Sequence, residues 1–234
     1  QLVETSDDVT IVEIANALSA FMGAEWQSFN APYDAYIAGE TAALNLTEKA
    51  GMNLFNGKGN CASCHSGNLF SDQQFHALAL PAFGPGRTRR FDPIPRDVGR
   101  MGKSDLQADA YRFRTPMLRN VALTAPYGHN GAYPTLEGII RHHVETVPQW
   151  SRDMLKLPKA PWIEHVDFAI QDNPRETIRL MRHRDTSPVD LSTSELDQLV
   201  AFLGSLTGTT IDTTPFGIPP SVPSGLPLDT LGKK

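Results

Sequence analysis

The chain has 234 residues, of which 40% are hydrophobic and 20% are charged, so it is long enough to bury one sizeable core, or a core with a smaller appended unit. It carries 21 basic and 26 acidic side chains, a formal net charge of -5, and no run of Lys or Arg follows an aromatic series. This balance argues against a nucleic-acid partner. No stretch approaches the ~20 apolar residues of a membrane helix, and the N-terminus lacks an export-signal pattern. We therefore expect no membrane span, in a chain that is either cytoplasmic or already processed.

The first element that the sequence predicts is an amphipathic helix from Val9 to about Trp26. Its apolar residues follow the i, i+3, i+4 spacing of one helix face: Ile11, Ile14, Ala15, Leu18, Phe21 and Met22. A short helix is expected next, with Thr47 as its N-cap and its end at Phe55, before the glycines at 57 and 59.

The stretch from Gly67 to Arg114 is rich in Gly, Pro, Asp and Arg, and its prolines exclude long regular elements. We expect an ordered but irregular segment there. Thr135 is expected to open a second long helix, and Ser192 with Glu195 three residues later is a capping box that opens a third. No strand pattern competes with these helices, so the predicted fold class is mainly α with long irregular loops.

Composition divides the chain into three parts. Residues 1–48 form an N-terminal helical segment, residues 49–207 hold the motif described next, and residues 208–234 are a tail rich in Thr, Pro, Ser and Gly. Such a tail cannot bury enough apolar area to fold alone. We expect it to be extended and loose, or packed on another surface.

The motif that carries chemistry is Cys61-Ala62-Ser63-Cys64-His65. Two thiols at this spacing can add to the two vinyl groups of a haem while the adjacent imidazole reaches the iron. A bare CxxC can also belong to a zinc site or a redox dithiol. Zinc needs two further ligands at a suitable spacing and a redox pair needs a preceding strand, and the sequence has neither. The motif therefore predicts one covalent haem c with His65 as an iron ligand.

The second iron ligand is expected on the helix that Thr135 opens. Helical spacing places His143 in one apolar stripe with Leu136, Ile139, Ile140 and Val147, whereas His142 is rotated about 100° away from it. A haem is a large apolar surface, so the histidine on the apolar face is the candidate, with His142 as the alternative. The weaker candidates are Met101 and Met117, which are more often packing residues. The histidines His76, His165 and His183 are interpreted as surface or structural. His129 lies in a turn-forming context, where a structural role is weighted at least as heavily as a redox one.

Two arginines flank Thr115-Pro116. A buried haem needs its propionates neutralised, and guanidinium groups suit that bidentate task. Arg114 and Arg119 are candidates for it, and a solvated loop is the equally weighted alternative.

Several further segments closely resemble the C-terminal half of the bacterial dihaem cytochrome c peroxidases and the related MauG-like enzymes. The resemblance runs from about residue 9 to about residue 208. It is carried by Asp97-Val98-Gly99-Arg100, Phe113-Arg114-Thr115-Pro116-Met117-Leu118-Arg119-Asn120-Val121, Thr124-Ala125-Pro126-Tyr127-Gly128-His129-Asn130-Gly131 and Thr135-Leu136-Glu137.

The resemblance implies a cytochrome-c-like haem domain, the electron-transfer partner of a catalytic haem in a preceding domain. In that family the second iron ligand lies eight residues after the Thr of Thr-Leu-Glu, which is His143 here. The family has Met or Tyr at that place, and two imidazoles generally give a lower potential than His with Met. The resemblance also implies a calcium ion held by the backbone carbonyls of Thr124 and Pro126, and a periplasmic location for the mature chain.

The sequence contains one CxxCH motif, and Gln1 stands roughly where the first haem domain of a family member would be ending. We therefore expect the chain by itself to move electrons without performing a reduction, with the catalytic haem on a separate or missing chain and a small redox protein as donor or acceptor. One alternative is a stand-alone monohaem periplasmic carrier. Another is a haem that becomes a peroxidase when His143 leaves the iron.

Overall fold

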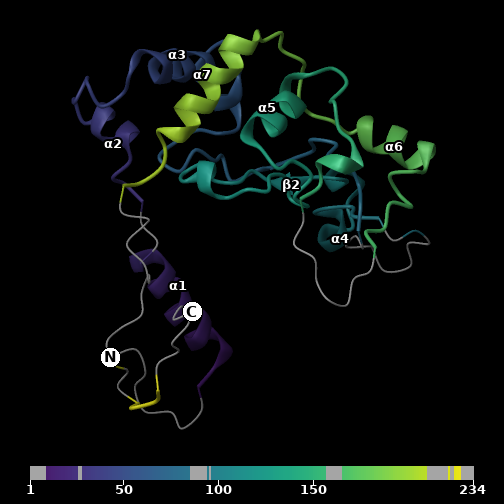
Figure 1. Cartoon of the computed structure of the whole chain (residues 1–234). Coiled ribbons are helices and arrows are strands. Elements are labelled where there is room, and N and C mark those ends of the chain that lie inside the picture. The colour runs from purple at the N-terminus through teal and green to yellow at the C-terminus, as the bar shows by residue number, and fades with distance from the viewer. Residues whose placement is uncertain are drawn as a thin grey trace. The chain divides into compact units, whose positions relative to one another are not determined.

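The computed structural model describes residues 9–25, 28–84, 94, 96–156, 165–209, 221 and 224–227. The chain forms two compact units, of which the larger is Ala31–Thr207 and the smaller combines Gln1–Asn30 with Gly208–Lys234. Residues 31–48, which composition grouped with the N-terminal segment, belong to the larger unit. Helices dominate the described residues (Figure 1), which confirms the mainly α fold class.

The frame of the larger unit is a pair of helices from opposite ends of its sequence, α3 (Leu46–Asn56) and α7 (Thr193–Gly204), which lie against each other (Figure 1). Gly51 makes this contact possible, because a Cβ there would lie 1.9 Å from the backbone oxygen of Gln198. The capping box predicted for α7 is present. The cap predicted for α3 is wrong by two residues: Asn45, paired with Glu48, caps the helix instead of Thr47.

The third helix of the core is α5 (Leu136–Val144), and its predicted N-cap is confirmed, since the Thr135 hydroxyl accepts a hydrogen bond from the Gly138 N–H. The helix is shorter than the apolar stripe suggested. Val147 lies beyond its end and is 70% exposed, so it does not belong to the buried face. The buried core around α3, α5 and α7 consists of Phe55, Phe70, Leu80, Val121, Tyr127, Ala132, Tyr133, Leu199, Phe202, Leu203 and Leu206.

The smaller unit contains α1 (Ile11–Glu25), which agrees with the helix predicted from the apolar spacing. Two short helices were not predicted: α2 (Pro32–Ile37) and α6 (Pro174–Met181). Both begin with a proline at the first helical turn, where the missing N–H costs nothing.

The irregular segment predicted between Gly67 and Arg114 is present, with short ordered pieces inside it. Strands β1 (Phe75–His76) and β2 (Phe113–Arg114) pair antiparallel with Phe75 opposite Arg114. The sequence did not predict this pair, because neither strand shows an alternation of apolar and polar residues. The other short elements are α4 (Met101–Ser104) and the 3₁₀ turns η1 (Cys61–Ser63), η2 (Gln107–Asp109), η3 (Val121–Leu123) and η4 (Arg152–Met154).

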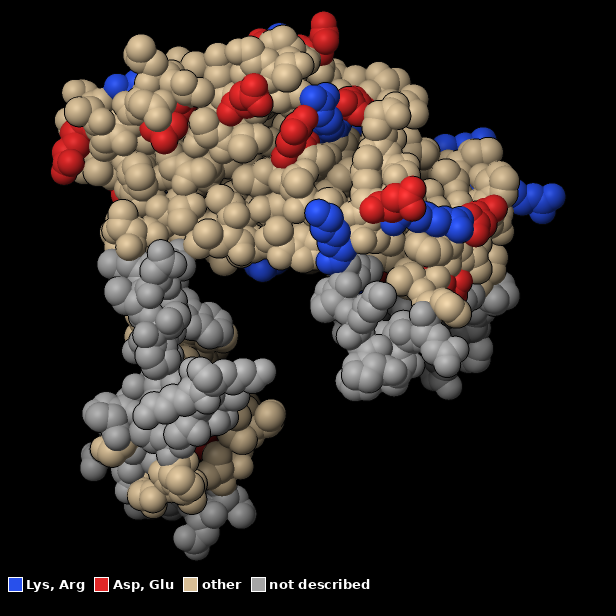
Figure 2. Space-filling view, viewed as in Figure 1, with Lys and Arg blue, Asp and Glu red and all other residues tan. Residues whose placement is uncertain are grey.

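Charge on the larger unit is distributed without a large area of one sign on the face that Figure 2 shows, where acidic and basic side chains are interspersed among uncharged ones. Within the described residues, no helix is both long and apolar enough to cross a membrane.

Candidate functional site

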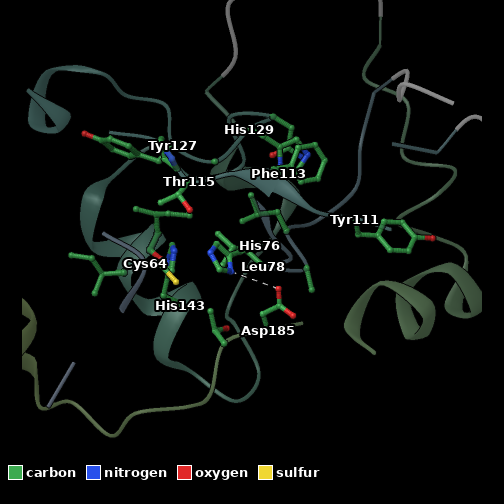
Figure 3. A pocket seen from close by; sticks show the side chains of 18 of the residues that line it. Cys64, His76, Leu78, Tyr111, Phe113, Thr115, Tyr127, His129, His143 and Asp185 are labelled. Atoms are coloured by element: carbon green, nitrogen blue, oxygen red, sulfur yellow. Dashed lines mark hydrogen bonds and ion pairs between the residues drawn. The ribbon is translucent and has the colours of Figure 1, made fainter. Parts of the chain in front are cut away.

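A cavity of about 880 Å³ opens inside the larger unit, within the range of about 300–1,000 Å³ that ligand and cofactor sites occupy. All four residues predicted to attach the haem or ligate its iron line it: Cys61, Cys64, His65 and His143. Figure 3 shows Cys64 and His143 among the side chains around this space. Much of the remaining lining is apolar and comes from the helical core, including Phe55, Leu80, Leu136, Ile140, Leu199 and Leu203.

One side of the cavity, the motif wall (residues 57–72), is built by contacts that are local in sequence. The chain leaves α3 through Gly59, where a Cβ would lie 2.9 Å from the Leu54 carbonyl and 3.3 Å from the Cys61 sulfur. The motif then folds into η1, and the His65 N–H donates to the Cys61 carbonyl at 2.9 Å. Both cysteines are unpaired and partly buried. Burial raises the pKa of the Cys61 thiol to about 11, so this thiol is protonated at neutral pH.

A second side, the α5 wall, consists of α5 and residues 184–189, which run past its end. His143 lines the cavity from this wall, and its Nδ1 lies 2.7 Å from the Ile139 carbonyl one turn back. Burial lowers the pKa of His143 to about 4, with the charge of His65 contributing in the same direction. His143 is therefore neutral at pH 7.

The two histidines predicted as iron ligands, His65 and His143, share one hydrogen-bonding arrangement. The Nδ1 of His65 lies 3.0 Å from the Phe70 carbonyl, and a carbonyl can only accept, so each ring donates its Nδ1–H to backbone. This arrangement leaves Nε2 of each ring as the lone-pair nitrogen. Burial also lowers the pKa of His65. Both are suited to ligate a metal through Nε2, with the backbone carbonyl fixing the ring.

His142 is buried, which the sequence did not predict. Its Nε2 lies 2.7 Å from the Leu78 carbonyl, and its Nδ1 lies 2.7 Å from the Tyr133 hydroxyl. Because both ring nitrogens have protein partners, His142 has no nitrogen left for a metal. The helical spacing correctly predicted that His142 and His143 lie on different faces of α5. The face that carries His142 was expected to lie beside the charged Arg141, but the segment around Leu78 covers it.

The two candidate arginines occupy different places. Arg114 lines the cavity and donates to the side-chain oxygen of Gln73. Arg119 does not line this cavity: its side chain is 8% exposed, binds both carboxylate oxygens of Asp34 at 2.9 and 2.8 Å, and donates to the Asn68 carbonyl. An arginine held this way braces the motif wall.

Thr124 and Pro126 also line the cavity, and their carbonyls stay candidates for calcium, since backbone oxygens are ligands that this ion accepts. Of the two methionines considered as alternative ligands, Met117 lines the cavity and is 48% exposed, whereas Met101 packs in a separate buried cluster with Val98 and Tyr111.

The structure adds cavity residues that sequence reasoning treated as surface or structural. His76, on β1, bonds to Asp72 at 2.8 Å and lies 3.9 Å from Asp185, as Figure 3 shows for the second contact. His129 stacks on Phe113 with ring centroids 3.5 Å apart. Both histidines line the cavity, but neither has a periodic signal, because they come from irregular segments.

The site fits a haem c on chemical grounds. It offers two thiols at CxxC spacing, an adjacent imidazole, a second imidazole from α5 and a largely apolar lining in one cavity. Cys64, Asp72 and His76 also offer ligand atoms within 4.8 Å of one another. A thioether made from Cys64 would be a poor ligand, so this group does not suggest a separate metal.

Comparison with known proteins finds relatives among the cytochrome c peroxidases and MauG proteins. The chain is 32% identical over 198 residues to the cytochrome-c peroxidase IdrP2 of Denitromonas iodatirespirans, covering 77% of this chain and 45% of that protein. It is 31% identical over 156 residues to the methylamine utilization protein MauG of Methylophilus methylotrophus. That match covers 64% of this chain and 43% of MauG. The chain belongs to the cytochrome c peroxidase and MauG-like family.

The fold agrees with that membership. The diheme peroxidase BthA of Burkholderia thailandensis is 26% identical to this chain and superposes on it with a TM-score of 0.58. The match covers 84% of this chain and 51% of the BthA chain. No protein-family model matches the chain. The chain spans about half the length of its peroxidase and MauG relatives, and their family identity supports a haem redox role.

Proposed function

We propose that this chain is the electron-transfer haem half of a dihaem peroxidase or MauG-like oxidoreductase, with one haem c attached to Cys61 and Cys64. It corresponds to the C-terminal half of the family proteins. The observation that supports this most is that His65 and His143 line the same cavity, each with its Nδ1 within hydrogen-bonding distance of a backbone carbonyl.

Two imidazole ligands suit electron transfer better than peroxide reduction. When bound, the haem supplies one-electron oxidation and reduction. His65 and His143 would hold the iron between them and leave peroxide no place to bind. The apolar residues from α5 and α7 would exclude water, and Arg114, which lines the cavity, would be available to neutralise a propionate. Two imidazole ligands give the haem iron a lower reduction potential than one His and one Met ligand do.

The partners follow from this role. A catalytic haem on a separate domain or chain exchanges electrons with this one, and a small redox protein is the outside donor or acceptor. The carbonyls of Thr124 and Pro126 hold a calcium ion beside the haem. The mature chain works in the periplasm, where c-type haem is attached.

Native mass spectrometry of the complex purified from its source, with haems and polypeptides counted together, tests the proposal. We expect one haem on this chain and a second, high-spin haem on a companion domain or chain. A single haem on a lone 234-residue chain that ignores peroxide would contradict the proposal, and the chain would then be a stand-alone carrier.

The ligation is tested separately on the matured chain carrying its haem. We expect a low-spin ferric spectrum typical of two imidazoles and no binding of carbon monoxide in the ferrous state. His143→Ala should give a high-spin haem that binds carbon monoxide, whereas His142→Ala, the adjacent matched variant, should keep the low-spin spectrum. If His142→Ala loses that spectrum and His143→Ala keeps it, the assignment of the ligand is wrong.

A further inference from the structure

The helix that carries His143 ends without a cap of its own. Its last helical residue is Val144, and Glu145 turns into extended backbone at φ -79 and ψ 142. No glycine follows to fold the chain back over the end, so the last carbonyls of α5 need partners from elsewhere. His143 belongs to this last turn, one residue from the end of the helix.

A single side chain from a distant segment supplies most of those partners. One terminal nitrogen of Arg184, Nη2, donates to the carbonyls of His142 at 2.7 Å and His143 at 3.1 Å. The other, Nη1, donates to the carbonyls of Glu145 at 2.8 Å and Thr146 at 3.4 Å. The planar fork of a guanidinium can span four carbonyls in this way, which a lysine ammonium cannot.

The guanidinium is itself held in place. Its Nε donates to the Thr186 hydroxyl at 2.7 Å, and the following segment returns to the helix, where the Val189 N–H donates to the Val144 carbonyl at 2.9 Å. Thr186 and Val189 also line the cavity. A positive charge at a helix C-terminus is favourable, because it meets the negative end of the helix dipole.

We propose that Arg184 is a positioning residue for the second iron ligand, holding the last turn of α5 so that His143 stays on the iron. The proposal rests on the ligation of iron by His143 described above. Without the guanidinium, four carbonyls of that turn lose a donor, and the turn opens more often. Each opening takes His143 away from the iron and admits an outside ligand.

The rate at which potassium cyanide binds to the ferric chain with its haem attached measures how often His143 leaves. Arg184→Gln should raise this rate about tenfold, since a cation at a helix end is worth roughly the free energy of a tenfold change. Arg184→Lys keeps the charge and loses the fork, so it should raise the rate by a smaller factor. Arg182→Gln, an exposed neighbour, makes the same charge change and should leave the rate unaltered.

The wild-type spectrum separates the two proposals. If it is not that of two axial imidazoles, the ligation by His143 fails and this inference fails with it. If it is, and Arg184→Gln binds cyanide at the wild-type rate or no faster than Arg182→Gln, then only the role of Arg184 is overturned. Should Arg184→Gln not accumulate as a folded protein, Arg184→Lys decides: an unchanged rate overturns the inference, and an increased rate supports it.

Discussion

The two walls of the cavity are built by different means. The motif wall is folded by neighbours in sequence and braced from a distance by Arg119: His65 bonds to the Phe70 carbonyl five residues away, and the Asp72 N–H donates to the Cys64 carbonyl. The α5 wall is held by distant segments, since His142 bonds to Leu78 and Arg184 reaches back over about 40 residues. A pattern in the sequence can describe the first wall, whereas the second exists only after the chain has folded.

This contrast makes the two walls sensitive to different changes. The motif wall adjoins the α3 and α7 frame and should lose stability when that frame is disturbed. Changes in the α5 wall should shift the position of His143 before they lower the free energy of unfolding, because the contacts of this wall hold one turn of a short helix. Four predictions address this difference.

The largest effect is expected at the close contact of α3 with α7. Gly51→Ala puts a methyl group 1.9 Å from the Gln198 backbone oxygen and 2.8 Å from the Phe202 Cβ, so the helices must separate. We expect a loss of about 3 kcal/mol or more in the free energy of unfolding, measured by denaturant titration. Gly204→Ala in α7 meets nothing within 4 Å and should be neutral or stabilising; equal losses in both variants would refute the packing explanation.

The next effect concerns the ion pair that braces the motif wall. Arg119→Gln removes both bonds to Asp34, whose side chain is 13% exposed, and should cost about 2 kcal/mol, less than a fully buried pair. Burial by itself raises the pKa of Asp34, but hydrogen bonds from Arg119 and the Ala31 N–H, with the charge of Arg119, outweigh it and lower the pKa.

That lowered pKa fixes the sign of the pH dependence. A carboxyl with a folded pKa below its unfolded value contributes its full stability above the unfolded pKa of about 4 and loses it as pH falls through the folded value. The difference between wild type and Arg119→Gln should therefore be constant near pH 7 and shrink in acid. A difference that grows in acid would show that Asp34 is not the partner that matters.

On the α5 wall, Tyr133→Phe removes the hydroxyl that bonds to His142. The expected cost is about 1 kcal/mol, read from thermal unfolding. The low-spin spectrum should stay unchanged, because the hydroxyl contacts the histidine that does not face the iron. A high-spin spectrum like the one expected for His143→Ala would mean that the two histidines do not have separate roles.

The smallest effect is expected for a surface contact between the frame helices. Lys58 pairs with Glu195 at 2.7 Å, with side chains 49% and 24% exposed. Lys58→Gln should cost under about 1 kcal/mol, and the difference should vanish at about 1 M salt. A larger loss that persists in salt would place this pair among the contacts that hold the motif wall.

The sequence predicted those features that depend on a few adjacent residues. The haem motif, the Thr135 cap and the Ser192 capping box are local patterns, and the structure contains the two caps as expected. The missed helix α6 also had a local signal, since Asn173 accepts from the Arg175 N–H ahead of a proline at the first turn. The cap of α3 was misplaced because Asn45 and Thr47 are both good capping residues.

The features that sequence reasoning missed depend on contacts between distant segments. The environment of His142 is set by Leu78, and that of Arg119 by Asp34, 85 residues away. The β1 and β2 pair is two residues long on each side, too short for an alternating pattern to register. His76 reaches the cavity through this pair, so its place could not be read from its neighbours in the chain.

The larger unit begins and ends at one point. The Tyr33 N–H donates to the Ser205 carbonyl at 3.1 Å, so the chain enters beside the place where it leaves. A unit with adjacent ends can be inserted into another protein, duplicated or joined to a new neighbour without stretching its interior. We expect this geometry to let evolution exchange a neighbouring domain while the interior of the larger unit stays the same.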